Sequence, residues 1–195
     1  MQTTTGNHLA FKSISRSILG MAAAVCLLTA SAKFQVPFWP VPMTLQLMVV
    51  LGLAVFTGPK QAFACVAAYL AAGAVGLPVF AGTPLKGIGL AYMVGPTGGY
   101  LLGFLVSTLV CGKMLERLGS KALIPALLAG MATIFAFGLA WLAFYVPAEK
   151  VLAIGLTPFL LGDIVELALI VAAYYAMPEK WKNMLRPSIK GEAND

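Results

Sequence analysis

The feature that most constrains this chain is a series of mainly apolar runs that continues along nearly its whole length. A helix that spans a bilayer needs roughly 20 apolar residues. Of the residues, 60% are apolar and 10% are charged, whereas soluble domains are closer to about half apolar and about a quarter charged. A bilayer, unlike water, can accept so much apolar surface. The sequence therefore predicts an all-α integral membrane protein.

Six runs are interpreted as transmembrane helices. Their approximate ranges are 14–32, 44–56, 61–75, 95–111, 122–146 and 153–177, and the second is short for a span. Together they predict a single membrane domain over residues 1–195, with a transmembrane core at about 14–178 and tails at 1–12 and 179–195.

The 13 basic residues test this scheme, because cytoplasmic loops carry an excess of Lys and Arg. Ten of them fall on the side of the two termini: Lys12, Arg16, Lys60, Lys113, Arg117, Lys121, Lys180, Lys182, Arg186 and Lys190. The other three are Lys33, Lys86 and Lys150. We therefore expect both termini in the cytoplasm. Because the basic residues flank apolar runs and form no stripe, the net charge of +6 does not indicate nucleic-acid binding.

The residue types that most enzymes use are scarce. His8, the only histidine, lies in a polar amino-terminal stretch, and the three cysteines show no CxxC spacing. The sequence contains no HExxH motif, no Ser/His pair and no ATP-binding motif. We therefore expect no enzyme activity, no metal and no cofactor.

Stretches rich in Gly and Pro interrupt the runs on the non-cytoplasmic side, at 36–44 and 76–95. Irregular backbone at membrane depth is tolerated only where protein or a water-filled cavity satisfies its polar groups. These stretches favour a cavity that opens outward and is capped by loops, and ordinary extramembrane loops are the alternative.

Asp163 and Glu166 are the acidic residues within an apolar run. A carboxylate there is costly, so it usually faces a cavity and has a function. The i, i+3 spacing places both on one helix face. Counting from a helix start near Ala153, at about 1.5 Å per residue, places Asp163 a third to half of the way in from outside. A pair that stabilises helix assembly and a proton relay are the alternatives.

Gly95, Gly99 and Gly103 recur every four residues and form a small-residue stripe for close helix packing. Packing does not account for Thr97 and Tyr100 at the outer mouth of the same run. Their hydroxyl groups and the Tyr100 ring are expected to face the cavity.

Two further clusters lie in or near the first run. One adjoins the outer connection between the first and second runs, and the other lies within the first run. Trp39 is either an interface anchor or a ligand contact, and Gln46, inside an apolar segment, needs a polar partner. Small residues in the first run allow close approach by another helix, from this chain or from a partner. They form two stripes, Gly20 with Ala24, and Ala22 with Cys26 and Ala30.

Four segments in this order resemble the BioY family, the substrate-capture (S) components of biotin transporters of the energy-coupling-factor (ECF) type. The segments are 41–46 (VPMTLQ), 76–82 (GLPVFAG), 95–104 (GPTGGYLLGF) and 158–163 (PFLLGD). The resemblance extends over roughly Ser17 to Met177.

The resemblance implies an S-component fold of six transmembrane helices, in a bacterial cytoplasmic membrane, with biotin bound near the outer face. It also implies a transmembrane coupling subunit and two cytoplasmic ATPases as partners, although some family members are thought to work without them. The two small-residue stripes of the first run resemble the surface on which S components dock to the coupling subunit.

Biotin offers two ureido N–H donors and one carbonyl acceptor, and Asp163 is expected to accept from an N–H. The other expected contacts are polar partners, Gln46, Thr97 and Tyr100, and aromatic covers for the thiophane ring and tail, Trp39 and Tyr92.

Glu166 stands where the family usually has a lysine of the ligand site. Weaker binding, a compensating donor such as Lys86, and a different ligand are the explanations left open. The chain could accordingly be an S component for another vitamin, or a proton-coupled carrier that uses Asp163 and Glu166 as a relay.

Overall fold

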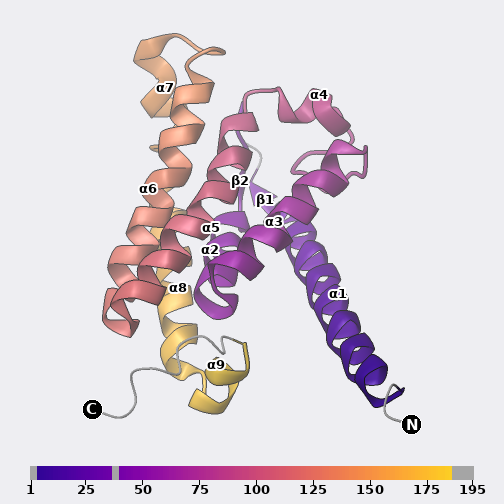
Figure 1. Cartoon of the computed structure of the whole chain (residues 1–195). Coiled ribbons are helices and arrows are strands. Elements are labelled where there is room, and N and C mark those ends of the chain that lie inside the picture. Colours follow the sequence, from indigo (N-terminus) through magenta and orange to yellow (C-terminus); the bar gives the residue numbers. More distant parts are fainter. Residues whose placement is uncertain (1–3, 37–39, 186–195) are drawn as a thin grey trace.

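Helices form nearly all of the regular structure in this computed structural model, which describes residues 4–36 and 40–185 (Figure 1). In chain order the elements are α1 (Thr4–Lys33), β1 (Gln35–Val36), β2 (Met43–Thr44), α2 (Gln46–Thr57), α3 (Pro59–Ala74), α4 (Gly89–Met93), α5 (Gly98–Leu118), the 3-10 turn η1 (Ser120–Ala122), α6 (Leu123–Leu142), α7 (Ala148–Gly155), α8 (Leu160–Ala176) and α9 (Glu179–Leu185). The two strands pair antiparallel, with Gln35 opposite Thr44 and Val36 opposite Met43.

The chain changes direction between α2 and α3 at Gly58, whose φ of 82° favours glycine. Pro59 then occupies the first turn of α3, where a missing N–H costs nothing. With 12 residues, α2 is about 18 Å long and does not by itself cross a hydrocarbon core of about 30 Å.

Helix α5 lies at the centre, where it contacts α2, α3 and α6. Its close approach to α6 depends on glycines. A Cβ at Gly99 would lie 2.2 Å from Trp141 Cβ, and one at Gly103 would lie 2.8 Å from Ile134 Cα. Larger residues at these two positions would therefore push the helices apart.

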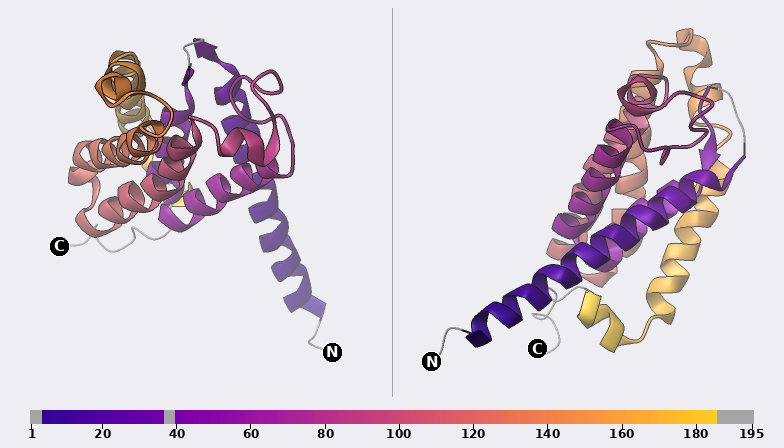
Figure 2. Two further views of the ribbon diagram at one scale, coloured as in Figure 1. Left: turned by 90° about the horizontal axis from the view of Figure 1, so that it is seen from above. Right: turned by 90° about the vertical axis from the view of Figure 1, so that its right-hand side faces the viewer.

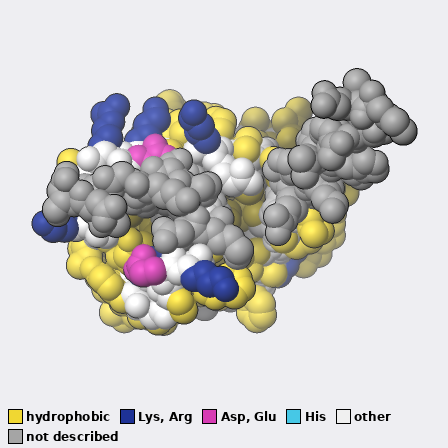
Figure 3. All heavy atoms as spheres, turned by 60° about the horizontal axis from the view of Figure 1, so that its bottom comes forward, with side chains coloured by type: hydrophobic (Ala, Val, Ile, Leu, Met, Phe, Trp, Pro, Cys, Tyr) yellow, Lys and Arg dark blue, Asp and Glu magenta, His cyan; other side chains and the backbone are white. Residues whose placement is uncertain are grey.

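The short helices between and after the long ones lie at two ends of the molecule (Figures 1 and 2). Helices α4 and α7 lie at one end, and α9 and the beginning of α1 lie at the other. Lys and Arg side chains gather around this second end (Figure 3).

By length and composition, two described helical segments can cross a membrane, Gly98–Leu118 and Ser120–Leu142. Helices α7 and α8 form a third candidate span if they count as one, with a bend of 41° between them. The apolar helices Ile18–Lys33 and Gln46–Thr57 are shorter.

The expectation of one continuous helix over 153–177 is wrong. Helix α7 ends at Gly155 and α8 begins at Leu160. Pro158 lies in the break, where it cannot donate to a helical hydrogen bond. As a result, Asp163 lies in the first turn of α8, and not a third to half of the way along an unbroken helix.

Two other boundaries differ from the expected ones. The fourth run was expected to end near residue 111, but α5 continues to Leu118 through residues that include Lys113 and Arg117. Hydropathy locates the apolar part of a helix and does not indicate how far the helix extends beyond it. The short helix α4 lies within the stretch at 76–95, where no helix was expected before residue 95.

Candidate ligand-binding cavity

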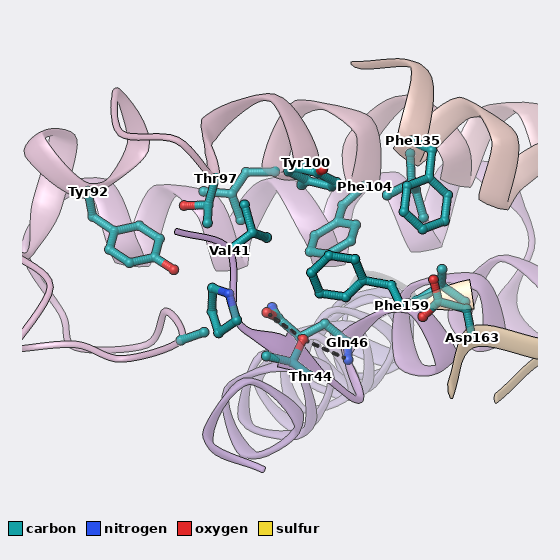
Figure 4. A pocket seen from close by; sticks show the side chains of 15 residues that line it. Val41, Thr44, Gln46, Tyr92, Thr97, Tyr100, Phe104, Phe135, Phe159 and Asp163 are labelled. Atoms are coloured by element: carbon teal, nitrogen blue, oxygen red, sulfur yellow. Dashed lines mark hydrogen bonds between the residues drawn. The ribbon is translucent and has the colours of Figure 1, made fainter. Parts of the chain in front are cut away.

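A cavity lies between α2, α5, α6 and α8, and the chain before α2 and the connection between α3 and α5 contribute to its wall (Figure 4). The space between its lining atoms is about 550 Å³, which includes open solvent at its mouth. It is lined by Val41, Pro42, Thr44, Gln46, Leu47, Ala81, Tyr92, Thr97, Tyr100, Leu101, Phe104, Ile134, Phe135, Phe159 and Asp163. Both interrupted stretches that the sequence singled out therefore contribute to the wall.

Asp163 carries the charge of this cavity when it is ionised, since the other lining residues are apolar or neutral. Its residue is 5% exposed, and its carboxyl group has no hydrogen-bond partner among the described residues. A buried carboxylate without a partner is costly. A ligand that donates hydrogen bonds to Asp163 would compensate for this cost.

Gln46, at the start of α2, is held by its neighbours. Its Nε2 donates to Tyr69 Oη at 2.9 Å, and Tyr69 Oη donates in turn to the Val79 carbonyl oxygen at 3.2 Å. Thr44 Oγ1 donates to Gln46 Oε1 at 3.3 Å. Tyr69 is thus the partner that this buried amide was expected to need. The amide orientation is set before a ligand arrives.

Tyr100 joins two elements of the wall. Its hydroxyl donates to the carbonyl oxygen of Gly155 at 2.8 Å, which connects α5 to the end of α7. Because its proton is engaged in this bond, the Tyr100 oxygen faces a ligand mainly as an acceptor.

Tyr92 and Thr97 form a second polar group in the cavity, away from Asp163 (Figure 4). The Tyr92 ring stacks on Phe80 with 4.9 Å between the ring centroids. Burial raises the pKa of the Tyr92 phenol above its ordinary value, so the hydroxyl is neutral at physiological pH and can donate a hydrogen bond.

Apolar side chains lie between the two polar groups, with Phe104 and Phe159 prominent among them (Figure 4). Sequence reasoning assigned no role to these two, or to Ile134 and Phe135 of α6. Phe159 precedes Asp163 by four residues, and this spacing, which is typical of two residues on one helix face, could have predicted that both line the cavity. Nothing in the long apolar run of α6 distinguishes Ile134 and Phe135 from ordinary core residues.

Three expected ligand residues are not among the described lining. Trp39 lies outside the described residues. Lys86 is exposed in the connection between α3 and α4, where its side chain lies over Gly82 and not in the cavity. The Glu166 carboxylate instead accepts a hydrogen bond from the backbone N–H of Met48 at 2.8 Å. The i, i+3 spacing places Glu166 and Asp163 on one face of α8. One turn beyond Asp163, however, this face meets α2 and not the cavity.

Lys33, expected only to mark the outer side, makes contacts that the sequence did not suggest. Its Nζ donates to the carbonyl oxygens of Phe80 (3.0 Å) and Thr83 (3.1 Å) and to Thr83 Oγ1 (2.9 Å). These acceptors use all three donors of the ammonium group. The end of α1 is thereby attached to the turn that contains Ala81 of the cavity wall.

The expected small-residue stripes differ in their surroundings. Gly95 precedes α5, and its carbonyl oxygen accepts a hydrogen bond from Trp141 Nε1 at 2.9 Å, so only Gly99 and Gly103 lie on the helix. In α1, Ala24 is buried, whereas Gly20 is exposed. The second stripe, Ala22 with Cys26 and Ala30, is exposed throughout. Gly20 and Ala24 therefore do not form one exposed surface.

A metal site has no support in the described part of the chain, where no three His, Cys, Asp or Glu side chains are grouped to hold an ion. The cavity combines buried apolar walls with a few directed polar groups, which is the composition of a small-molecule binding site.

The fold and cavity together define a helical membrane protein with a binding site for a small ligand near one end of its helices. Comparison with known proteins identifies the family. A model of the BioY family matches residues 3–183, and the chain belongs to this family.

Individual relatives agree with this assignment. The chain is 38% identical to the biotin transporter BioY of Thermotoga maritima over 164 residues, which cover 83% of this chain and 94% of that protein. It is also 38% identical to a probable biotin transporter BioY of Pyrococcus horikoshii over 148 residues, which cover 76% of this chain and 87% of the relative. Among solved structures, the S-component for biotin from an ECF-type ABC transporter superposes with a TM-score of 0.72 and 28% identity, covering 83% of this chain and 89% of the other.

Proposed function

We propose that this chain captures biotin at the outer face of a bacterial cytoplasmic membrane, as the substrate-binding S component of a biotin transporter. The observation that supports this most directly is Asp163, a buried carboxyl group without a hydrogen-bond partner among the described residues, which faces a largely apolar cavity. The names of the relatives and of the superposed structure point to the same ligand.

Biotin suits the distribution of polar groups. A ureido N–H that donates to Asp163 would form a charge-assisted hydrogen bond worth about 1.5–3 kcal/mol. The thiophane ring and aliphatic tail would contact Phe104 and Phe159. The tail would extend toward Tyr92 and Thr97, whose hydroxyl groups could bind its carboxylate.

The proposed topology has six membrane spans and both termini in the cytoplasm. The spans are α1, α3, α5, α6, the bent pair of α7 and α8, and α2, which crosses only together with the chain that precedes it. The grouping of Lys and Arg side chains at the end that holds α9 and the beginning of α1 supports a cytoplasmic location for that end (Figure 3). The cavity cover formed by 41–44 and 81–92 then faces outward.

The chain works as a binding component and not as an enzyme, with no cofactor of its own. We propose that a transmembrane coupling subunit and two cytoplasmic ATPases supply the energy for uptake, because the sequence has no ATP-binding motif. The exposed stripe of Ala22, Cys26 and Ala30 is the proposed docking surface for the coupling subunit.

Calorimetric titration of biotin into the purified, detergent-solubilised protein tests the proposal, with thiamin and riboflavin as controls. We expect tight one-to-one binding of biotin alone. Binding of another vitamin instead of biotin would assign the chain to a different S-component specificity. Binding of none would overturn the proposal and direct attention to a proton-coupled carrier, for which uptake would depend on a proton gradient.

A further inference from the structure

Glu166, the second acidic residue of α8, has a hydrogen-bond partner within the protein. Glu166 is 4% exposed, and its Oε2 accepts a hydrogen bond from the backbone N–H of Met48 at 2.8 Å. The two residues are 118 positions apart in sequence, so this bond connects α8 with the beginning of α2.

The first N–H groups of any helix lack partners within that helix. Helix α2 begins at Gln46, which makes Met48 its third residue. The preceding residue, Leu45, has no side-chain oxygen and forms no capping hydrogen bond. Ser, Thr, Asp or Asn usually fills this role. Thr44 Oγ1 accepts from the Gln46 N–H at 3.4 Å, and Glu166 supplies from another helix the acceptor for the Met48 N–H.

Both helix starts that this bond connects also carry polar residues of the cavity. Gln46 is the first residue of α2, two positions before Met48, and Asp163 is one turn before Glu166 in α8. Glu166 itself lies in a neighbouring groove between α8 and the chain around Thr44, outside the cavity lining. The bond therefore contributes to fixing the distance between Gln46 and Asp163 without itself occupying the ligand space.

We propose that Glu166 is a positioning residue: by capping α2 from α8 it holds Gln46 and Asp163 in register for the ligand, and it does not contact the ligand. The inference rests on the proposed binding of biotin. This positioning role requires the length and the acceptor oxygen of the Glu166 side chain but not its negative charge.

Two substitutions separate length from charge. Glu166→Gln keeps the length and an acceptor oxygen but removes the charge, whereas Glu166→Asp keeps the charge but is one methylene too short to reach Met48. The matched controls are Glu116→Gln and Glu116→Asp, at an exposed position near the carboxyl-terminal end of α5. Biotin affinity is measured by calorimetry on all five full-length proteins, including the wild type, after their thermal unfolding has shown that they are folded.

We expect Glu166→Gln to bind biotin within about threefold of the wild type and Glu166→Asp to bind about tenfold more weakly. Neither Glu116 control should change the affinity. The reverse order, with Asp tolerated and Gln weakened, would show that the charge acts on the ligand and would overturn the proposal. Equal affinity in all Glu166 variants would overturn it as well.

If Glu166→Asp does not fold, Glu166→Gln decides alone. A folded Glu166→Gln protein that loses more than about tenfold contradicts the cap, and one that retains affinity supports the cap over a direct action of the charge on the ligand. Failure of the wild type to bind biotin would instead contradict the proposed function, so the two failures are distinguishable.

Discussion

The two sides of the cavity are held together by different kinds of contact. On one side, α5 and α6 approach so closely that Gly99 and Gly103 have no space for a Cβ. On the other side, α8 is joined to α2 through a hydrogen bond from Met48 to Glu166 and a contact between the Phe56 and Tyr174 rings, and Leu161 and Val165 on α8 are largely exposed. Close steric packing tolerates almost no displacement, whereas a hydrogen bond or a ring contact is worth only about 1–3 kcal/mol. The rigid contact between α5 and α6 therefore sets the shape of the site, whereas α8, held in register by weaker contacts, has more freedom to adjust around a ligand.

The largest expected effect is on the rigid side. Gly99→Leu would place a side chain against Trp141 Cβ and the Phe137 carbonyl oxygen, and overpacking of this kind should lower the free energy of unfolding by about 3 kcal/mol. Thermal unfolding of the purified protein measures the loss. Gly20→Leu is the control, because nothing lies within 4 Å of a Cβ at Gly20. Equal unfolding temperatures for the two variants would show that the α5–α6 interface is not closely packed.

On the adjustable side, Asp163→Asn removes the charged acceptor from the cavity. The variant should fold, because this carboxyl group makes no hydrogen bond to the described protein, but its biotin affinity should fall roughly 30-fold or more. Titration calorimetry measures the change, with Glu149→Gln at an exposed position of α7 as the control. An unchanged affinity would remove Asp163 from the site.

Lys33→Met tests the attachment between α1 and the outer turn. It removes three hydrogen bonds to Phe80 and Thr83 while it keeps an unbranched apolar stem. The turn at 80–83 should become mobile, and biotin affinity should fall about tenfold through faster dissociation. Surface-immobilised protein and labelled biotin give the dissociation rate, and Lys150→Met, at an exposed position, is the comparison. If both variants release biotin at the wild-type rate, the turn does not retain the ligand.

The smallest effect concerns the bond between α5 and the end of α7. Tyr100→Phe removes the hydroxyl that donates to Gly155, and an ordinary hydrogen bond of about 1 kcal/mol corresponds to about fivefold in biotin affinity. Tyr175→Phe, at a residue that is 67% exposed, should have no effect. A loss far above tenfold would indicate that Tyr100 contacts biotin directly.

The sequence predicted the helices well where an apolar run ends at helix-breaking residues. The run expected at 61–75 corresponds to α3 (Pro59–Ala74), between Gly58 and the turn that contains Gly76. It failed at Pro158, because this proline lies inside an apolar run and hydropathy does not register a break in the backbone. The short helix α4 was missed for a related reason, since its five residues are too few for a periodic pattern.

For the site, residues whose polarity conflicts with their apolar surroundings could be found. Gln46, Thr97, Tyr100 and Asp163 were chosen in this way, and all four line the cavity. Glu166 met the same criterion but bonds to a backbone N–H. Backbone donors do not differ from one residue to the next, so sequence reasoning could not anticipate this partner.

The attachment of Lys33 to the turn at 80–83 also has a thermodynamic consequence. A displacement of α1 either carries this turn, and with it Ala81 of the cavity wall, or breaks three hydrogen bonds. A partner that shifts α1 therefore changes the free energy of ligand binding. Because such coupling is reciprocal, the ligand changes the affinity for that partner by the same factor.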